Sequence, residues 1–259
     1  MTNRDWLAIS RRTSAPAVRL VCLPHAGGGT TVFHPWTKEL PPYIEVCSVR
    51  LPGRESRHFE PLRGNASSIV WELADVLLTL PPAPSLAIFG HSMGALLAFE
   101  LAHALADRRL RTDLLVVSGR RAPHRHSGTT ERRHLLPDDE LLEVLLERYG
   151  GIPKEVLDDR ELMAMFLPIL RADLKVVETY RFTPRSQGDW PLMVYGGIGD
   201  RSVGREDLLE WQQLTRGPFR LEMMPGDHFF LQTNRAAFLE RLVDDIRTWC
   251  TSPAQTIRP

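Results

Sequence analysis

The chain has 259 residues, of which 43% are hydrophobic and 25% are charged, a composition typical of a water-soluble globular protein. Its 32 basic and 32 acidic residues cancel to a formal net charge of zero, so charge gives no reason to expect a nucleic-acid or membrane partner. No apolar run has the length of a membrane span, and residues 1–14 lack the apolar core of a signal peptide, so we expect a cytoplasmic protein. The three cysteines lack metal-binding spacing, so we expect no metal site.

Apolar runs suited to buried strands alternate along the chain with segments suited to helices. Strands are predicted at residues 17–23, 44–50, 85–89, 113–118, 191–195 and 219–224. Helices are predicted near residues 31–39, 66–79, 93–106, 205–215 and 233–249. Regular alternation of this kind predicts an α/β fold, in which a mostly parallel central sheet is flanked by helices on both faces.

The first predicted strand leads into a loop with three consecutive glycines, Gly27 to Gly29. Without side chains, such a run lets the backbone approach a substrate carbonyl closely. A glycine run can also cradle a phosphate, but this one lacks the Lys-Ser/Thr ending of a P-loop and the spacing of a dinucleotide-binding loop. We therefore expect an oxyanion loop, in which the backbone N–H of Ala26, to within one residue, stabilises a developing negative charge.

The most informative motif is Gly90-His91-Ser92-Met93-Gly94, which reads G-x-S-x-G. An apolar run suited to a strand precedes it, and a segment rich in Ala and Leu suited to a helix follows. A strand, a sharp turn and a helix are what a nucleophile elbow requires, whereas the pentapeptide alone also occurs in ordinary loops. The motif in this setting predicts Ser92 as a nucleophile and the N–H of Met93 as an oxyanion donor.

Residues 120–184 interrupt the alternation, because they contain no convincing buried strand. Pro137 followed by three acidic residues predicts the start of one helix, and a second is predicted from Glu161 to Leu170. Whether this second helix continues past Pro168 toward Tyr180 is left open by the sequence.

An all-helical insertion between two core strands predicts a lid over the nucleophile. The chain is then a single domain, with a core formed by residues 1–119 and 185–259 and a lid at about 120–184. Several apolar lid residues could line an acyl-binding pocket, although packing of the lid onto the core explains each of them equally well. They are Met163, Met165, Phe166, Leu167 and Leu170.

An acid and a base follow the last two predicted strands. Asp200 lies in a glycine-rich turn after the strand at 191–195, and His228 comes directly after the strand at 219–224. Open α/β sheets build their sites just past the carboxyl ends of strands. Asp227 competes with Asp200 for the acid role, but an acid adjacent to the histidine usually points elsewhere. We therefore predict Asp200 as the acid that orients His228.

Five motifs taken together resemble the type II thioesterases associated with polyketide and nonribosomal peptide synthases, over nearly the whole chain. They are Leu23-Pro24-His25-Ala26-Gly27-Gly28-Gly29, Leu51-Pro52-Gly53-Arg54-Glu55, Gly90-His91-Ser92-Met93-Gly94, Leu167-Pro168-Ile169-Leu170-Arg171-Ala172-Asp173 and Gly226-Asp227-His228-Phe229-Phe230. The combination is specific, whereas G-H-S-M-G alone would not be.

The resemblance implies an α/β-hydrolase fold with a helical lid. It places the triad of this family on Ser92, Asp200 and His228, and its oxyanion donors on Ala26 and Met93. It also implies hydrolysis of acyl groups from the phosphopantetheine arm of acyl or peptidyl carrier proteins, which removes aberrant or stalled acyl units. Such an enzyme needs no metal and no cofactor, and we expect it to act in trans as a monomer.

A basic stretch near the start of the predicted lid has two explanations of equal weight. It can be a solvated loop, or it can contact an acidic carrier protein or the phosphate of its pantetheine arm, which arginine binds well through two nitrogens. The arginines concerned are Arg120, Arg121, Arg125, Arg132 and Arg133.

Three other functions fit part of the pattern. The medium-chain fatty acyl thioesterases of animals are similar at the motif level. An acyltransferase or cyclase on the same scaffold would replace water by an alcohol or an amine. A non-catalytic binding protein with a hydrolase fold usually has a broken triad, whereas all three members are present in this sequence.

Overall fold

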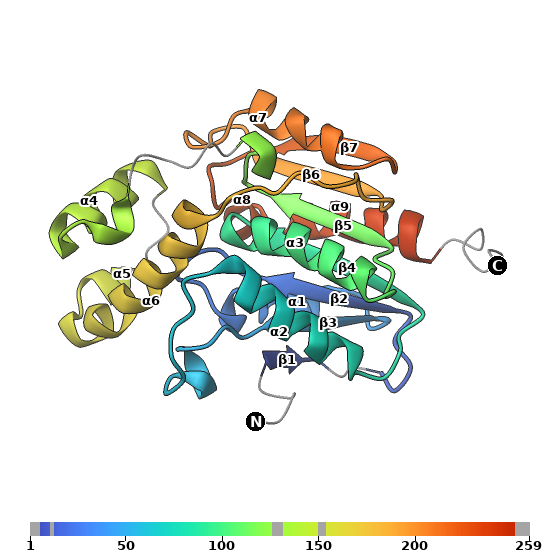
Figure 1. Ribbon diagram of the computed structural model, residues 1–259, viewed down its shortest axis with the longest axis horizontal. Helices are drawn as coiled ribbons and strands as arrows, with labels where there is room; N and C mark the ends of the chain where they lie inside the picture. Colours follow the sequence, from blue (N-terminus) through green and yellow to red (C-terminus); the bar gives the residue numbers. More distant parts are fainter. Residues whose placement is uncertain (1–5, 11–12, 126–131, 150–153, 252–259) are drawn as a thin grey trace.

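The computed structural model describes residues 6–10, 13–125, 132–149 and 154–251, which build one sheet with helices on both faces (Figure 1). The seven strands of this sheet lie in the order β1-β3-β2-β4-β5-β6-β7, and all neighbours are parallel except β1 and β3. The strands are β1 (Leu7–Ile9), β2 (Val18–Leu23), β3 (Ile44–Val49), β4 (Ser85–His91), β5 (Leu114–Ser118), β6 (Leu192–Gly197) and β7 (Phe219–Met224).

Strand β1, which pairs with β3 at the edge of the sheet through Leu7 and Val49, was not predicted from the sequence. A strand of three residues is too short to display an alternating or continuous apolar pattern. The other six strands match the six predicted ones to within a few residues.

The two faces of the sheet carry separate hydrophobic cores. Along β2, Val21 and Leu23 face one core, and Leu20 and Cys22 face the other. The first core is covered by α2 and α3, and the second by α1, α8 and α9. The helices are α1 (Trp36–Glu39), α2 (Ala66–Leu78), α3 (Met93–Asp107), α4 (Asp138–Arg148), α5 (Lys154–Leu157), α6 (Arg160–Thr179), α7 (Arg205–Leu209), α8 (Phe230–Thr233) and α9 (Arg235–Cys250).

Two of the predicted helices are shorter than expected. At residues 31–39 a 3-10 turn, Thr30–Phe33, precedes α1, because Pro35 has no N–H with which to continue a hydrogen-bonded helix. At residues 205–215 the helix α7 changes into a 3-10 turn, Glu210–Leu214.

The segment between β5 and β6, here called the helical insertion, contains α4, α5 and α6, which Figure 1 shows together beyond one end of the sheet. The side chain of Asp159 caps α6 by accepting hydrogen bonds from the N–H groups of Glu161 and Leu162. The helix then continues through Pro168 to Thr179, so the longer of the two alternatives is the one observed. A small hydrophobic cluster joins α4 to α6 through Leu141, Leu145, Leu167, Leu170 and Leu174.

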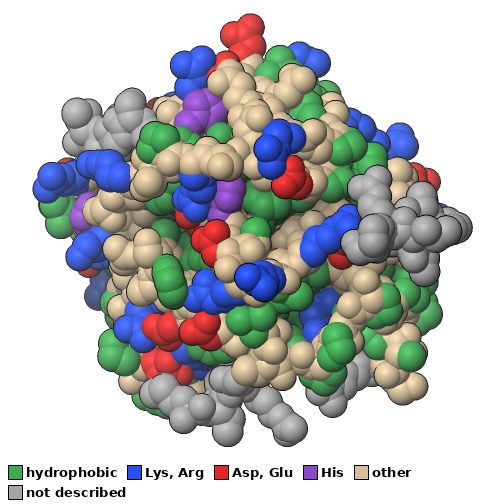
Figure 2. Space-filling view, turned by 45° about the vertical axis from the view of Figure 1, so that its right-hand side comes forward, with side chains coloured by type: hydrophobic (Ala, Val, Ile, Leu, Met, Phe, Trp, Pro, Cys, Tyr) green, Lys and Arg blue, Asp and Glu red, His purple; other side chains and the backbone are tan. Residues whose placement is uncertain are grey.

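Charges of both signs are interspersed on the face of the molecule shown in Figure 2. Many of the exposed charges on the molecule form ion pairs, such as Arg216 with Asp189 at 2.8 Å. Exposed pairs of this kind contribute little to stability. None of the helices in the described ranges is both long and apolar enough to span a bilayer.

The three cysteines are buried and unpaired, and burial raises the pKa of each thiol: Cys22, Cys47 and Cys250. Thiols with raised pKa values form little thiolate at neutral pH. Their environment is that of small core side chains rather than of reactive groups.

Candidate active site

Ser92 occupies a sharp turn between β4 and α3, with φ 55° and ψ −112°. A β-carbon on Gly90 would lie 2.0 Å from the carbonyl oxygen of Gly94, and one on Gly94 would lie 2.1 Å from the carbonyl oxygen of Leu23. Both positions therefore require glycine, which explains the spacing of the motif. The Ser92 N–H donates to the carbonyl of Ser118 at 2.8 Å, which ties the strained turn to β5.

His228 and Asp200 meet beyond the ends of β7 and β6. The His228 Nδ1 atom lies 2.7 Å from Asp200 Oδ2, and both side chains are buried. Ser202 supports the acid, because its N–H and hydroxyl donate to Asp200 Oδ1 at 2.8 and 2.6 Å. Burial raises the pKa of Asp200, but the hydrogen bond and charge of His228, with the bonds from Ser202, outweigh it and lower the pKa overall.

Asp227, the competing acid, has a different role in the structure. It is exposed, and its side chain accepts a hydrogen bond from the N–H of Phe229 at 2.8 Å. Its carboxylate thus caps the turn that leads into α8, whereas the carboxylate of Asp200 reaches the imidazole. This geometry favours Asp200 as the partner of His228.

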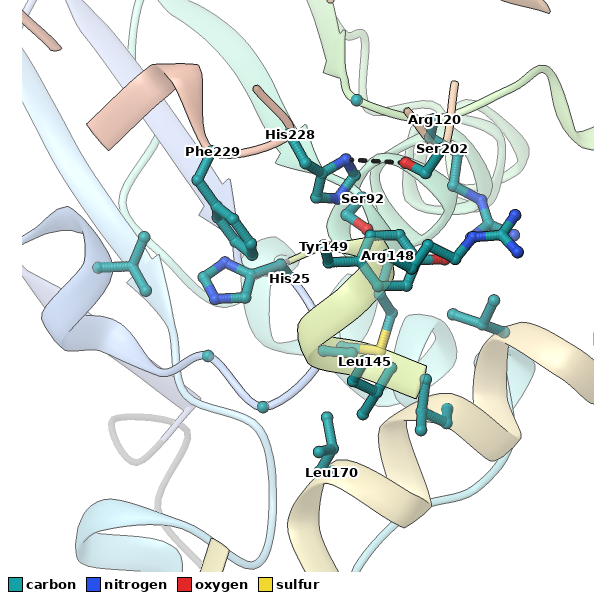
Figure 3. Close-up of a pocket in the computed structure, with 18 of the residues that line it drawn as sticks. His25, Ser92, Arg120, Leu145, Arg148, Tyr149, Leu170, Ser202, His228 and Phe229 are labelled. Atoms are coloured by element: carbon teal, nitrogen blue, oxygen red, sulfur yellow. Dashed lines mark hydrogen bonds between the residues drawn. The ribbon is translucent and has the colours of Figure 1, made fainter. Parts of the chain in front are cut away.

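Ser92, His228, Ala26 and Met93 all line one pocket of about 600 Å³ between the sheet and the helical insertion (Figure 3). His228 Nδ1 contacts Asp200 and Ser202, and the Ser92 hydroxyl has no hydrogen-bond partner among the described residues. Catalytic hydrogen bonds are often long in the absence of substrate. Met93 is the first residue of α3, so its N–H has no partner within the helix and can serve a ligand.

The glycine loop that contains Ala26 is held in place by a buried ion pair. Asp173, on α6, accepts a hydrogen bond from the N–H of Gly27 at 2.8 Å. The same carboxylate receives two bonds from Arg54, at 2.8 and 2.7 Å, and Arg54 also donates to the carbonyl of Gly28 at 2.7 Å. One charged pair thus connects the helical insertion, the glycine loop and the loop after β3.

Glu55 fixes the far end of the same loop. Its carboxylate accepts hydrogen bonds from the N–H and the hydroxyl of Thr30 at 2.6 and 2.7 Å, and from Arg50 at 3.0 Å. Glu55 adopts a left-handed backbone with φ 52°, which is unfavourable for a residue with a side chain. No role was predicted from the sequence for Arg54, Glu55 or Asp173, although all three lie within the motifs that carry the family resemblance.

The two alternatives for the apolar residues of the helical insertion apply to different residues. Phe166 and Leu170 line the pocket, as the sequence suggested. Met165 instead points away from it and is 65% exposed, and Met163 and Leu167 pack in the cluster between α4 and α6. The reason is helical periodicity, since residues 166 and 170 share one face of α6 and residue 165 lies on another.

The described arginines of the basic stretch divide between the pocket and the surface. Arg120, Arg121 and Arg133 line the pocket, Arg121 also lies 3.9 Å from Asp207, and Arg125 pairs with Glu210 at 2.8 Å on the surface. Residues 126–131, between these arginines and Arg132, lie outside the described ranges. The explanation of a uniform solvated loop is therefore wrong for Arg120.

Two further histidines, His25 and His91, surround His228. The imidazole centroids of His91 and His228 are 4.9 Å apart, and His91 Nδ1 lies 3.0 Å from the Ser118 hydroxyl. Burial, followed by the charge of His228, lowers the pKa of both, and the pKa of His25 falls to about 4. Both rings are thus neutral at pH 7 and add no positive charge beside His228.

The neutral His25, which is partly buried, makes the fold sensitive to acid. Its pKa falls from 6.5 to about 4 on folding, so between these values the unfolded chain binds more protons and stability decreases as the pH falls. At pH 5 this one group should lower the free energy of unfolding by about 2 kcal/mol relative to pH 7. Urea unfolding at both pH values should show a smaller loss in His25→Asn than in the wild type. An equal loss would contradict this account, and His34→Asn, at an exposed site, is the control.

In the part of the chain that the structure describes, no cluster of three or more His, Cys, Asp or Glu side chains could hold a metal ion. The groups that line the pocket include a hydroxyl, the imidazole of an imidazole–carboxylate pair, backbone N–H groups and guanidinium groups.

Known proteins resemble this chain over most of its length. The model of the thioesterase domain family matches residues 18–250. The gramicidin S biosynthesis protein GrsT of Aneurinibacillus migulanus is 37% identical over 243 residues, which cover 93% of this chain and 94% of that protein. The medium-chain S-acyl fatty acid synthase thioesterase of Rattus norvegicus is 36% identical, with 82% and 81% covered.

Among solved structures, the type II thioesterase BorB from the borrelidin biosynthetic cluster superposes with a TM-score of 0.83 at 35% identity, and the match covers 93% of this chain and 96% of that one. This similarity confirms the predicted fold, with its mostly parallel sheet flanked by helices.

Proposed function

The chain belongs to the thioesterase domain family, as its motifs predicted, and we propose that it releases acyl groups from the phosphopantetheine arm of acyl or peptidyl carrier proteins. Membership of the family makes it a hydrolase that acts on thioesters. Its similarity to GrsT and to BorB, both from natural-product biosynthesis, supports a role in clearing aberrant or stalled acyl units. In this role it would act in trans, as a cytoplasmic monomer.

One observation carries the reaction: Ser92 and the His228–Asp200 pair converge on a single pocket. In the proposed mechanism His228 takes the proton of Ser92 as the hydroxyl oxygen attacks the thioester carbon. Asp200 holds the imidazole so that its Nε2 faces the serine, and it stabilises the imidazolium that forms. The thiol then leaves with the proton from His228, and the acyl group remains as an ester on Ser92.

The same groups then hydrolyse this ester, with water in place of the serine hydroxyl as the attacking group. His228 removes a proton from water, the hydroxide attacks the ester carbon, and the acid departs as Ser92 recovers its proton. In both steps negative charge develops on the carbonyl oxygen. The N–H groups of Ala26 and Met93 are our candidates for stabilising it, and the loss of one such donor typically lowers kcat by ~10²–10³.

The proposal is tested on a panel of acyl-carrier proteins that differ in acyl length and branching. Intact-protein mass spectrometry before and after treatment should show the loss of the acyl mass, with the free acid as product. Transfer to an added alcohol or amine would indicate an acyltransferase or cyclase instead. Hydrolysis confined to medium-chain fatty acyl groups would indicate the activity named for the rat relative. Binding without turnover would contradict an enzymatic role.

The ion pair between Arg54 and Asp173 should control catalysis through the glycine loop. Removing only one partner would leave a buried charge unpaired and destabilise the fold. The double variant Arg54→Met/Asp173→Leu replaces the pair by apolar side chains, which is often neutral for stability. It leaves the loop unanchored at Gly27 and Gly28, and misplacement by about 1 Å can lower the rate by roughly 10².

The measurement is kcat and KM on a soluble thioester, together with the melting temperature. A large fall in kcat with a preserved melting temperature is expected. The matched control is Arg216→Met/Asp189→Leu, an exposed ion pair, which should leave both quantities unchanged. An unaltered kcat in the Arg54/Asp173 variant would show that the pair does not position the loop.

A further inference from the structure

The backbone of Arg120 lies close to the proposed nucleophile, Ser92. It follows Gly119, whose added β-carbon would lie 2.5 Å from an atom of the His91 ring and 3.3 Å from an atom of the His228 ring. The residue before that glycine, Ser118, accepts the hydrogen bond from the Ser92 N–H. The Arg120 carbonyl in turn accepts a hydrogen bond from the Trp211 indole at 2.6 Å, which fixes this backbone. The side chain then extends along the pocket wall.

The guanidinium of Arg120 lacks a partner in the part of the chain that the structure describes. Its Nε atom is buried without a hydrogen bond, and no acidic side chain there pairs with it. Burial, with a smaller effect from the charge of Arg121, lowers the pKa of Arg120 to about 10. The group is still protonated at pH 7, so a positive charge faces the pocket.

The fully buried arginines among the described residues each have an acidic partner. Arg19 pairs with Glu45, Arg54 with Asp173 and Arg57 with Glu60, at 2.7, 2.7 and 2.6 Å. Arg120 is only partly buried, but its Nε atom is enclosed without a partner, so this charge is left open at a cost in stability that the paired arginines avoid.

An acidic residue does line the same pocket, but it is engaged elsewhere. The Glu178 carboxylate accepts hydrogen bonds from the N–H groups of Arg133 and His134, and it contacts the His134 ring. It is therefore not the partner of Arg120. Figure 3 shows Arg120 and Arg148 on one side of the pocket and His25 and Phe229 on the other, so the pocket has a cationic side close to Ser92.

We propose that Arg120 binds an oxygen acceptor of the substrate, a carbonyl or a carboxylate, close to the thioester. The planar guanidinium can donate two parallel hydrogen bonds to such a group. This inference rests on the proposed function, and two parts of the substrate can supply the oxygen. One is an oxo or carboxylate group on the acyl chain next to the thioester. The other is the amide carbonyl of the pantetheine arm nearest to the sulfur.

Four thioesters separate these sources: butyryl and 3-oxobutyryl groups, each carried by pantetheine and by ethanethiol. In Arg120→Met, kcat/KM should fall about tenfold to hundredfold for the substrates that carry the recognised oxygen, the range expected for a hydrogen bond to a charged group. A fall limited to the 3-oxobutyryl pair identifies the acyl chain, and one limited to the pantetheine pair identifies the arm. Arg120→Lys, which keeps the charge but loses the planar fork, should recover part of the loss.

Stability distinguishes binding from a structural role. Because Arg120 has no ion pair to lose, Arg120→Met should melt at the same or a higher temperature than the wild type. Arg125→Met, at the exposed pair with Glu210, is the matched control and should change neither activity nor melting. An equal fall on all four substrates, no change on any of them, or a markedly lower melting temperature would overturn the proposal.

Binding measured without turnover keeps this inference separate from the proposed function. On a Ser92→Ala background, calorimetry with the same four thioesters should show that the Arg120→Met change removes the preference for the oxygen-bearing compounds. A preference that persists would overturn the assignment of Arg120, whether or not the wild type acts on carrier proteins. A wild type that binds these compounds through Arg120 but releases no acyl group from carrier proteins would overturn only the proposed function.

Discussion

Ser92→Ala is expected to abolish thioester hydrolysis, with kcat falling roughly 10⁶-fold, the scale observed when a serine hydrolase loses its nucleophile. Without the hydroxyl no acyl ester can form, and the remaining groups can only assist direct attack by water. The substitution keeps the β-carbon, so the positive φ at this turn is no more strained than before. The variant should therefore retain its circular dichroism spectrum and melting temperature.

A steady-state assay with an acyl-N-acetylcysteamine thioester measures this loss. Ser67→Ala, at an exposed position on α2, is the control for a serine outside the pocket and should be fully active. Substantial activity in Ser92→Ala would mean that another group attacks the thioester, and the proposed mechanism would fail.

Asp200→Asn should lower kcat by roughly 10⁴, the scale seen when a triad acid can no longer hold the histidine in its working tautomer. The amide at position 200 can donate a hydrogen bond to His228 Nδ1. The imidazole proton would then sit on Nε2, and Nε2 could no longer accept the proton of Ser92. The substitution would also remove the negative charge that stabilises the imidazolium. The pocket geometry should change little, because Asn has nearly the same shape as Asp.

Asp227→Asn is the matched comparison, since this acid is adjacent to His228 in sequence but caps the turn at Phe229. Its effect on kcat should be small. The same assay, with melting temperatures to exclude unfolding, ranks the two variants. If Asp227→Asn were the more damaging change, the assignment of the acid would have to be reversed.

Local sequence patterns were sufficient for the central sheet and for the position of the candidate residues. Long apolar runs identified β2 to β7, and the strand–turn–helix setting of Ser92 placed it correctly above the sheet. The predicted pair Asp200 and His228 lies within hydrogen-bonding distance. These features are readable because each depends on a few consecutive residues. The strand β1 could not be predicted, because three residues at a sheet edge are too few to show a periodic pattern.

Features that depend on long-range contacts could not be predicted in this way. Asp173 lies among apolar residues of α6, and its function becomes visible only when Arg54, 119 positions earlier in the chain, reaches it. Arg120 belongs to a run of basic residues that looks solvated, yet β5 delivers its side chain into the pocket. In each case the role of the charged residue depends on its neighbours in the folded structure, and the local sequence does not show which residues these are.

The most direct test is to identify the residue that reacts covalently with a serine-hydrolase inhibitor. The protein is treated with a fluorophosphonate, digested, and analysed by peptide mass spectrometry, with Ser92→Ala as the matched control. We expect a single phosphonylated peptide that contains Ser92, and no labelled peptide from the variant. A label on another residue, or an equal label in the variant, would contradict the claim that this thioesterase works through an acyl ester on Ser92.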